Sequence, residues 1–207
     1  MTAKEAYISM LTLFAELYKY PDKDTLKQIA SGAADKELCE TAAYLALPPE
    51  AYDRRLQALH TENNPITTQY MKAFSGIVKP FYPPVESLYK PWSTDPNAPD
   101  GKGRRRGYYM GDSALHLKHL LGSYGFEIPR EYENMPDHLA IELELYAYLV
   151  DQDSDGAKLF HRDHFDWLEE FYANLQELGE IPFYIEATRM LLHLLAKDPQ
   201  CYCDGKE

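Results

Sequence analysis

The sequence predicts an all-α fold. Leucine occurs 26 times and valine 3 times in 207 residues, and few segments show the alternation of β-branched residues that a half-buried strand requires. Apolar residues recur instead every three or four positions, which is the spacing of an amphipathic helix. We therefore expect one helical domain of about nine to ten helices, or two helical lobes joined by a long loop rich in proline and glycine.

The N-terminal part supplies the first predicted helices. Tyr7, Leu11 and Phe14 follow helical spacing and the segment stops at Pro21, so a helix is predicted over 4–20. Shorter helices are predicted to follow over three ranges: 24–31, 35–47 and 49–60. Asn64 and Pro65 are typical of an N-cap and a first helical residue, and they predict a further helix that runs to about Phe74.

Residues 76–107 differ in character from the segments before them. They hold six prolines, four glycines and the basic cluster Arg104-Arg105-Arg106. Connections of this length within a compact domain are usually functional or mobile. We expect a binding loop, a hinge between two lobes, or a plain surface loop.

The C-terminal half predicts four more helices. Their expected ranges are 108–122, 137–151, 158–178 and 182–196, with Pro182 at the start of the last. In the second of these, Leu139, Leu143 and Tyr146 form one apolar stripe that predicts a core-facing helix, and Glu142 and Glu144 fall off that stripe. Residues 197–207 are expected to be a tail.

Charge and composition limit the classes of function that this protein can have. Acidic residues number 33 and basic residues 21, for a formal net charge of −12, which repels phosphate backbones and attracts basic ligands. We expect no nucleic-acid partner. No run of about 18 apolar residues is present and the first residues lack a signal-peptide pattern, so no membrane insertion is expected. Three cysteines are too few for a disulfide framework, which favours a reducing cytoplasm.

One run of acids resembles a metal loop and fails a stricter test. Residues 151–156, DQDSDG, match the start of an EF-hand calcium loop, but the twelfth position of that loop holds Arg162 instead of a bidentate carboxylate. A cation there repels calcium. We interpret the run as a polar connection between helices.

Histidines form two pairs at helical spacing. His116 with His119, and His161 with His164, each lie three residues apart, whereas zinc needs three or four converging ligands. Cys201 and Cys203 form a lone CxC motif in the expected tail. We expect no metal, no cofactor and no catalytic residue. The alternative function is an all-α metal-dependent hydrolase that uses the following residues: His116, His119, Asp137, His138 and the cluster 161–166.

The triplet Pro136-Asp137-His138 precedes the most apolar predicted helix. Pro136 suits a first turn and Asp137 interacts favourably with the helix dipole, so a helix start explains both. A charged imidazole is disfavoured at a helix N-terminus, so His138 indicates a local polar partner or a ligand contact. On the residues alone, the structural and the functional interpretation both stay open.

Two separated stretches of the chain resemble a known family. The first stretch is PPVESLY at 83–89, and Tyr70, Phe74 and Pro80 precede it. The second stretch is MPDHLAIELE at 135–144. The link between them contains YYMGDSALHLKHLLGSYGFEIP at 108–129, which also resembles the family. Over about residues 66–151 the chain is similar to the TorD/DmsD/NarJ family of cytoplasmic chaperones for molybdenum-containing redox enzymes. It departs from the family pattern at Met135, where a glutamate usually precedes the proline by one residue, and at Val85, where an aromatic residue is common.

The resemblance implies a helical chaperone over residues 1–207 that binds the twin-arginine signal peptide of a molybdoenzyme catalytic subunit and delays export until the cofactor is loaded. Such a peptide needs carboxylates beside an apolar, aromatic-lined groove. A scaffold for a folded partner is a third interpretation. The protein is expected to be a monomer, or a dimer that exchanges a lobe through the 76–107 connection. The residues expected to line or support the peptide site are Tyr70, Phe74, Pro84, Glu86, Tyr89, Pro136, Asp137 and His138.

Overall fold

The computed structural model describes residues 1–95, 97, 103–152 and 154–197. Within these residues it contains nine α-helices, short 3-10 helices and one isolated β-bridge, so the all-α prediction is confirmed. Asp153, Cys201 and Cys203, and nearly all of the expected tail, lie outside the described residues. No described helix is both long enough and apolar enough to span a membrane.

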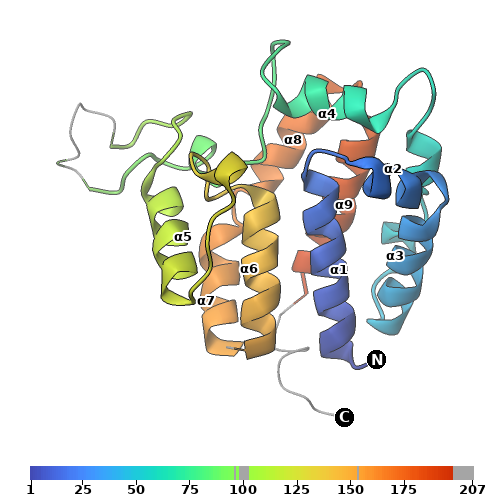
Figure 1. The fold of residues 1–207 in the computed structure, drawn as a ribbon, viewed down its shortest axis with the longest axis horizontal. Coiled ribbons are helices and arrows are strands. Elements are labelled where there is room, and N and C mark those ends of the chain that lie inside the picture. The colour runs from blue at the N-terminus through green and yellow to red at the C-terminus, as the bar shows by residue number, and fades with distance from the viewer. Residues whose placement is uncertain (96, 98–102, 153, 198–207) are drawn as a thin grey trace.

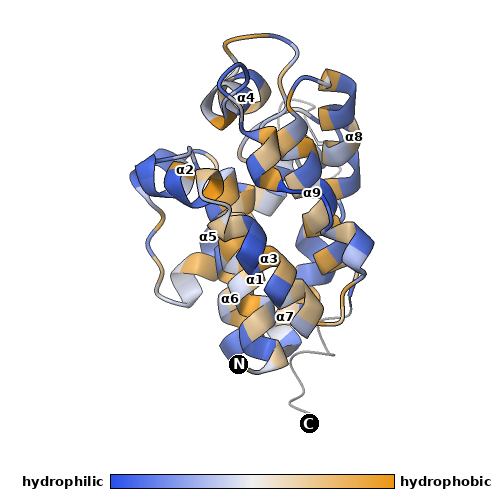
Figure 2. Cartoon of the chain, turned by 90° about the vertical axis from the view of Figure 1, so that its right-hand side faces the viewer, coloured by the Kyte–Doolittle hydropathy of each residue, from blue (hydrophilic) through white to orange (hydrophobic). Residues whose placement is uncertain are grey.

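The helices pack around a central pair. Helices α1 and α6 lie side by side in the middle of the molecule, with α7 against α6 and α3 against α1, and α8 packs with α9 (Figure 1). Figure 2 shows hydrophilic and hydrophobic residues distributed around the same helices, as amphipathic segments require. The bounds of the helices are α1 Ala3–Tyr18, α2 Lys23–Ala30, α3 Ala33–Tyr44, α4 Ile66–Phe74, α5 Asp112–Ser123, α6 Leu139–Gln152, α7 Ser154–His164, α8 Leu168–Leu178 and α9 Pro182–Leu195.

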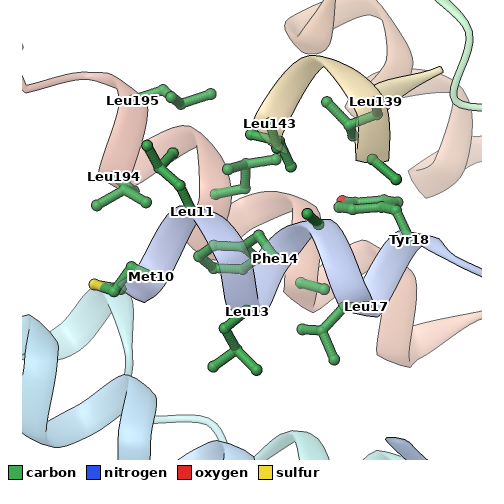
Figure 3. Packing of buried hydrophobic residues seen from close by; sticks show 14 of the residues in the cluster. Met10, Leu11, Leu13, Phe14, Leu17, Tyr18, Leu139, Leu143, Leu194 and Leu195 are labelled. Atoms are coloured by element: carbon green, nitrogen blue, oxygen red, sulfur yellow. The ribbon is translucent and has the colours of Figure 1, made fainter. Parts of the chain in front are cut away.

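Helix α1 forms the centre of the core. It begins with a capping box in which Thr2 accepts from the backbone N–H of Glu5 and the Glu5 carboxylate accepts from the N–H of Thr2. Leu11 and Phe14 are fully buried and lie near Leu143 of α6 and Leu194 of α9 (Figure 3). The buried apolar residues form one cluster that runs from α1 to α9. One continuous core therefore holds the N- and C-terminal halves together.

The helix predicted over 49–60 is wrong. Two 3-10 helices, Pro49–Ala51 and Leu56–Leu59, stand there instead. The buried carboxylate of Asp35 accepts the N–H groups of Leu56 at 2.7 Å and Gln57 at 2.9 Å. Because these donors are taken by a side chain on α3, they are not available for an α-helical ladder.

Helix α4 begins one residue later than predicted. Pro65 is the N-cap residue, and Nδ1 of His60 accepts from the N–H of Ile66 at 3.1 Å, so Asn64 is not the cap. The buried Gln69 then ties α4 to α9, because its Oε1 accepts from the N–H of Phe183 at 2.8 Å. His60, and not Asn64, thus accepts the first N–H group of α4.

The helix predicted over 158–178 is two helices. Helix α7 starts earlier, at Ser154, and ends at His164, and α8 starts at Leu168. The indole N–H of Trp167 donates to the carbonyl of His164 at 2.8 Å, and Phe165 and Trp167 are both buried. Burial of these two rings at the break turns α8 toward α9.

Helix α5 begins at Asp112 rather than at 108. The N–H of Asp112 donates to the carbonyl of Trp92 at 2.7 Å, so the chain before α5 passes close under the Trp92 segment. A Cβ atom on Gly111 would lie 2.8 Å from that carbonyl oxygen, which explains the glycine. The described part of the 76–107 connection is thereby anchored to the helical body.

Candidate functional site

The two stretches that carry the family resemblance lie against each other. Val85 and His138 form an antiparallel β-bridge. The N–H of Glu86 donates to the carbonyl of Asp137 at 3.0 Å, and the N–H of Leu139 donates to the carbonyl of Pro84 at 2.9 Å. Segments about 50 residues apart in sequence therefore share one backbone junction at the start of α6.

Asp137 joins the two segments through its side chain. Its Oδ2 accepts from the N–H of Ser87 at 2.7 Å, and the residue is 0% exposed. Burial raises the pKa of Asp137, and the hydrogen bond from Ser87 opposes that rise. The predicted helix start at Asp137 is therefore corrected, because α6 begins at Leu139. Asp137 is a buried residue that hydrogen-bonds the 84–87 segment to the start of α6, and it is not an exposed cap.

His138 receives the local polar partner that its position predicts. Its Nδ1 accepts from the N–H of Ala140 at 3.2 Å, and its ring lies 4.9 Å from the ring of Tyr132. Burial lowers the pKa of His138 to about 3. A neutral imidazole thus satisfies one of the free N–H groups at the start of α6, where a charged one would be disfavoured.

The buried Glu86 is the centre of a chain of polar side chains that reaches the surface at His116. Its Oε2 lies 2.8 Å from Nδ1 of His164, and its Oε1 lies 2.6 Å from the ammonium of Lys90. Nε2 of His164 in turn lies 2.9 Å from Nδ1 of His116. Burial raises the pKa of Glu86, but the hydrogen bond from His164 and the charge of Lys90 outweigh burial and hold it below its ordinary value.

Glu142 is the site residue that the sequence analysis placed wrongly. It was expected to fall off the apolar stripe, yet it is 0% exposed and faces Glu86, while Glu144 is exposed. Burial, and then the charge of Glu86, raise the pKa of Glu142 well above its ordinary value. A glutamate within an otherwise apolar helix was the signal for such a buried acid.

The predicted aromatic residues divide into core and surface. Tyr89 stacks on Trp167 with ring centroids 4.9 Å apart, and Phe74 packs on Tyr184 at 4.7 Å, so both belong to the core. Tyr70 is half-buried and packs against Tyr20, which is 58% exposed. Of the eight predicted site residues, only Tyr70 is not buried.

The residues of the alternative hydrolase are not assembled as a set. His116 and His164 meet, but His119 is exposed, and His161 bonds to the backbone carbonyl of Leu195 at 2.8 Å. Asp163 makes a two-point hydrogen bond to Arg162. In the described part of the chain, the group whose ligand atoms converge within 4.8 Å is instead Glu86, Glu142 and His164.

A small cleft opens on the surface between α5 and α6. Its volume is about 150 Å³, and we call it the acidic cleft because two glutamates accompany an apolar lining. Glu144 contacts the ammonium of Lys19 at 2.6 Å and is itself 43% exposed. The lining residues are Leu121, Phe126, Glu127, Ile128, Pro129, Ile141, Glu144 and Leu145.

Comparison with known proteins shows the fold and the family of this chain. The crystal structure of a candidate redox enzyme maturation protein from Archaeoglobus fulgidus matches 93% of this chain and 94% of that one, with a TM-score of 0.52 and 21% identity. The family model described as nitrate reductase delta subunit matches residues 30–177, and the chain belongs to that family. The resemblance to the TorD/DmsD/NarJ proteins is thereby confirmed.

One curated relative supports the same assignment. The chaperone protein TorD of Vibrio cholerae is 27% identical over 109 residues, and the match covers 46% of this chain and 50% of that protein. The chain spans about half the length of this relative.

The role of Asp137 leads to a first prediction. Asp137→Ala leaves the buried N–H of Ser87 without an acceptor, so the free energy of unfolding is expected to fall by about 1–3 kcal/mol. Asp137→Asn keeps an oxygen acceptor and is expected to cost less. Urea denaturation of both variants at neutral pH measures the difference. Equal losses of unfolding free energy would argue against the hydrogen bond from Ser87 to Asp137 as a stabilising contact.

Proposed function

We propose that this protein is a cytoplasmic chaperone that binds the twin-arginine signal peptide of a molybdoenzyme catalytic subunit and holds the apoenzyme until its cofactor is inserted. The family and the TorD relative support the chaperone role. The protein acts in this proposal without catalytic chemistry, as a monomer or as a lobe-exchanged dimer. The observation that carries the peptide-binding role is the acidic cleft, with exposed carboxylates beside an apolar lining.

The chemistry of the acidic cleft suits such a peptide. Its apolar lining accepts one or two apolar side chains, and the carboxylates of Glu127 and Glu144 suit bidentate pairing with guanidinium groups. Glu144 already attracts one cation, because Lys19 bonds to it and to Glu16. A peptide arginine competes with that single ammonium and adds a second hydrogen bond. The net charge of −12 favours the approach of a basic peptide.

The residues of the two family motifs act mainly as support in this proposal. Pro84, Glu86, Pro136, Asp137 and His138 hold the first turn of α6 in place. That turn carries Ile141 and, within one further turn, Glu144, which line the acidic cleft. Phe74 and Tyr89 hold the same region from the core side, while Tyr70, with the exposed Tyr20, offers aromatic surface for the rest of the peptide.

Calorimetry with a synthetic twin-arginine signal peptide tests the function. We expect binding that weakens about tenfold or more when both arginines are replaced by lysine, because lysine cannot pair with a carboxylate through two parallel bonds. The double variant Glu127→Gln and Glu144→Gln is expected to weaken binding similarly. Glu170→Gln is the matched control, because Glu170 is an exposed glutamate on α8 that pairs with Arg106 at 2.7 Å.

The Asp137 and His138 variants separate support from contact. Asp137→Ala and His138→Ala are expected to weaken peptide binding because they loosen the start of α6, whereas Asp137→Asn, which keeps the acceptor, is expected to bind normally. Unchanged affinity in both alanine variants would remove the two residues from the site. Equal affinity of the arginine and lysine peptides would overturn the twin-arginine assignment.

A further inference from the structure

The contact between Glu86 and Glu142 raises a question of charge. Both side chains are 0% exposed, and neither oxygen of Glu142 has a hydrogen-bond donor. Two ionised carboxylates carry no proton to share, so their close approach in a low-dielectric interior is strongly unfavourable unless something positive lies between them. The third buried carboxylate, Asp137, adds to this negative potential, as its effect on Glu142 indicates.

The single positive charge of Lys90 does not balance these acids. Lys90 is the ammonium that contacts Glu86, and it is shared with Asp166, whose Oδ1 lies 2.6 Å away. It reaches Oε1 of Glu86, on the other side of that carboxylate from His164. Among the described contacts of Glu142 there is no salt bridge. The face of Glu86 that carries Oε2, together with Glu142, therefore offers a place for an added positive charge.

We propose that Glu86, Glu142 and His164 form a binding site for one divalent first-row transition-metal cation. One ligand atom from each of these residues, a carboxylate oxygen of Glu86, a carboxylate oxygen of Glu142 and a ring nitrogen of His164, lies within 4.8 Å of the other two. Oε2 of Glu86 and Nδ1 of His164 are 2.8 Å apart. Ligand atoms of a metal bound at about 2.1 Å are about 3–4 Å apart, so small side-chain rotations close the site. Two carboxylates with one imidazole suit Mn²⁺, Fe²⁺ or Zn²⁺.

The groups behind these three ligands have the arrangement that metal ligands require. Metal-bound histidines usually hydrogen-bond through their other ring nitrogen, and ligating carboxylates are themselves hydrogen-bonded. Nε2 of His164 bonds to Nδ1 of His116 at 2.9 Å, and the second oxygen of Glu86 bonds to Lys90. These two contacts use Nε2 of His164 and Oε1 of Glu86, so Nδ1 of His164 and Oε2 of Glu86 remain available to a metal ion.

The side chain of His116 separates His164 from a nearby cavity. A cavity of about 570 Å³ lies between α5, α6 and α7, and His116 lines it. Asp155, Asp163 and Arg162 also line this cavity, and Arg162 is hydrogen-bonded to Asp163. His116 lies directly between the cavity and His164 in the hydrogen-bonded chain. Movement of the His116 side chain would therefore open a path for a metal ion from this cavity to His164.

Manganese binding measured by electron paramagnetic resonance tests the site. Protein freed of metal by a chelator is titrated with Mn²⁺, a hard cation that avoids the thiols of Cys39, Cys201 and Cys203. We expect one Mn²⁺ per chain, with a rise in the melting temperature. Glu142→Gln is expected to weaken this binding at least tenfold, and it should fold, since its amide can donate to Glu86. His119→Gln, an exposed histidine on α5, is the control and is expected to bind normally.

Two results would overturn the site. Absence of a tight Mn²⁺ equivalent in the wild-type protein would mean that a proton, and not a metal, joins Glu86 and Glu142. Equal binding by wild type and Glu142→Gln would assign the manganese to surface carboxylates. Should Glu142→Gln prove unfolded by circular dichroism, His164→Asn gives the same comparison, because it removes one ligand and retains a polar side chain.

Discussion

Glu86→Ala is expected to lower the free energy of unfolding by about 3–5 kcal/mol. Glu86 is 0% exposed and is bonded to His164 at 2.8 Å and to Lys90 at 2.6 Å. Removal of its carboxylate leaves the largely buried Lys90 with Asp166 as its one remaining acidic partner, beside the carbonyl of Asp163, and it leaves Nδ1 of His164 without its partner. The loss of one member of a buried ion pair costs more than the pair itself contributes, because the remaining charge stays desolvated.

The matched control for Glu86→Ala is Glu170→Ala. Glu170 also pairs with a basic side chain at close range, Arg106 at 2.7 Å, but both of these side chains are about half exposed. An exposed pair of this kind contributes about 0–1 kcal/mol. Urea denaturation at neutral pH, with the midpoint and the slope fitted separately, measures both variants. Similar losses in the two variants would show that the Glu86 network does not stabilise the fold.

Local sequence patterns predicted the helices whose ends depend on neighbouring residues. Helix α1, which stops before Pro21, and α9, which starts at Pro182, have nearly the predicted bounds. The errors occur where a side chain from another segment takes over a backbone group: Asp35 binds the N–H groups of the 56–57 segment, and His60 replaces Asn64 as the cap of α4. Such contacts have no periodic signature, so sequence spacing alone could not reveal them.

The sequence resemblance singled out two segments that do meet in space, but it did not predict that their residues are buried. Pro84, Glu86, Asp137 and His138 do meet, yet all are buried, because the two segments cover each other. Glu142 was missed because helical periodicity treats a glutamate as solvent-facing. A buried glutamate is stable only with partners from other elements, here Glu86 and the residues around it. The packing shows that these motif residues are buried at the start of α6 rather than exposed on the surface.

The pH dependence of stability is expected to reveal the buried imidazole of His138. Burial lowers its pKa from an ordinary value of 6.5 to about 3 in the folded protein. The unfolded chain therefore binds a proton below pH 6.5 that the folded chain does not bind until about pH 3. The stability contributed by neutral His138 is complete above pH 6.5 and is lost as the pH falls toward 3, at about 1.4 kcal/mol per pH unit, to a total on the order of 5 kcal/mol.

His138→Asn isolates this contribution. The asparagine side-chain oxygen can accept from the N–H of Ala140, as Nδ1 of His138 does, but it does not titrate. Asp137 and Glu142 have raised pKa values, so they bind protons more readily in the folded state and offset part of the acid sensitivity in both proteins equally. The difference between the two stability curves, measured by urea denaturation from pH 7.5 to 5, therefore reports on His138. The difference in stability between variant and wild type is expected to be constant above pH 6.5 and to shift in favour of the variant below pH 6.5. Curves that stay parallel over the whole range would mean that the imidazole is protonated as easily in the folded protein as in the unfolded chain.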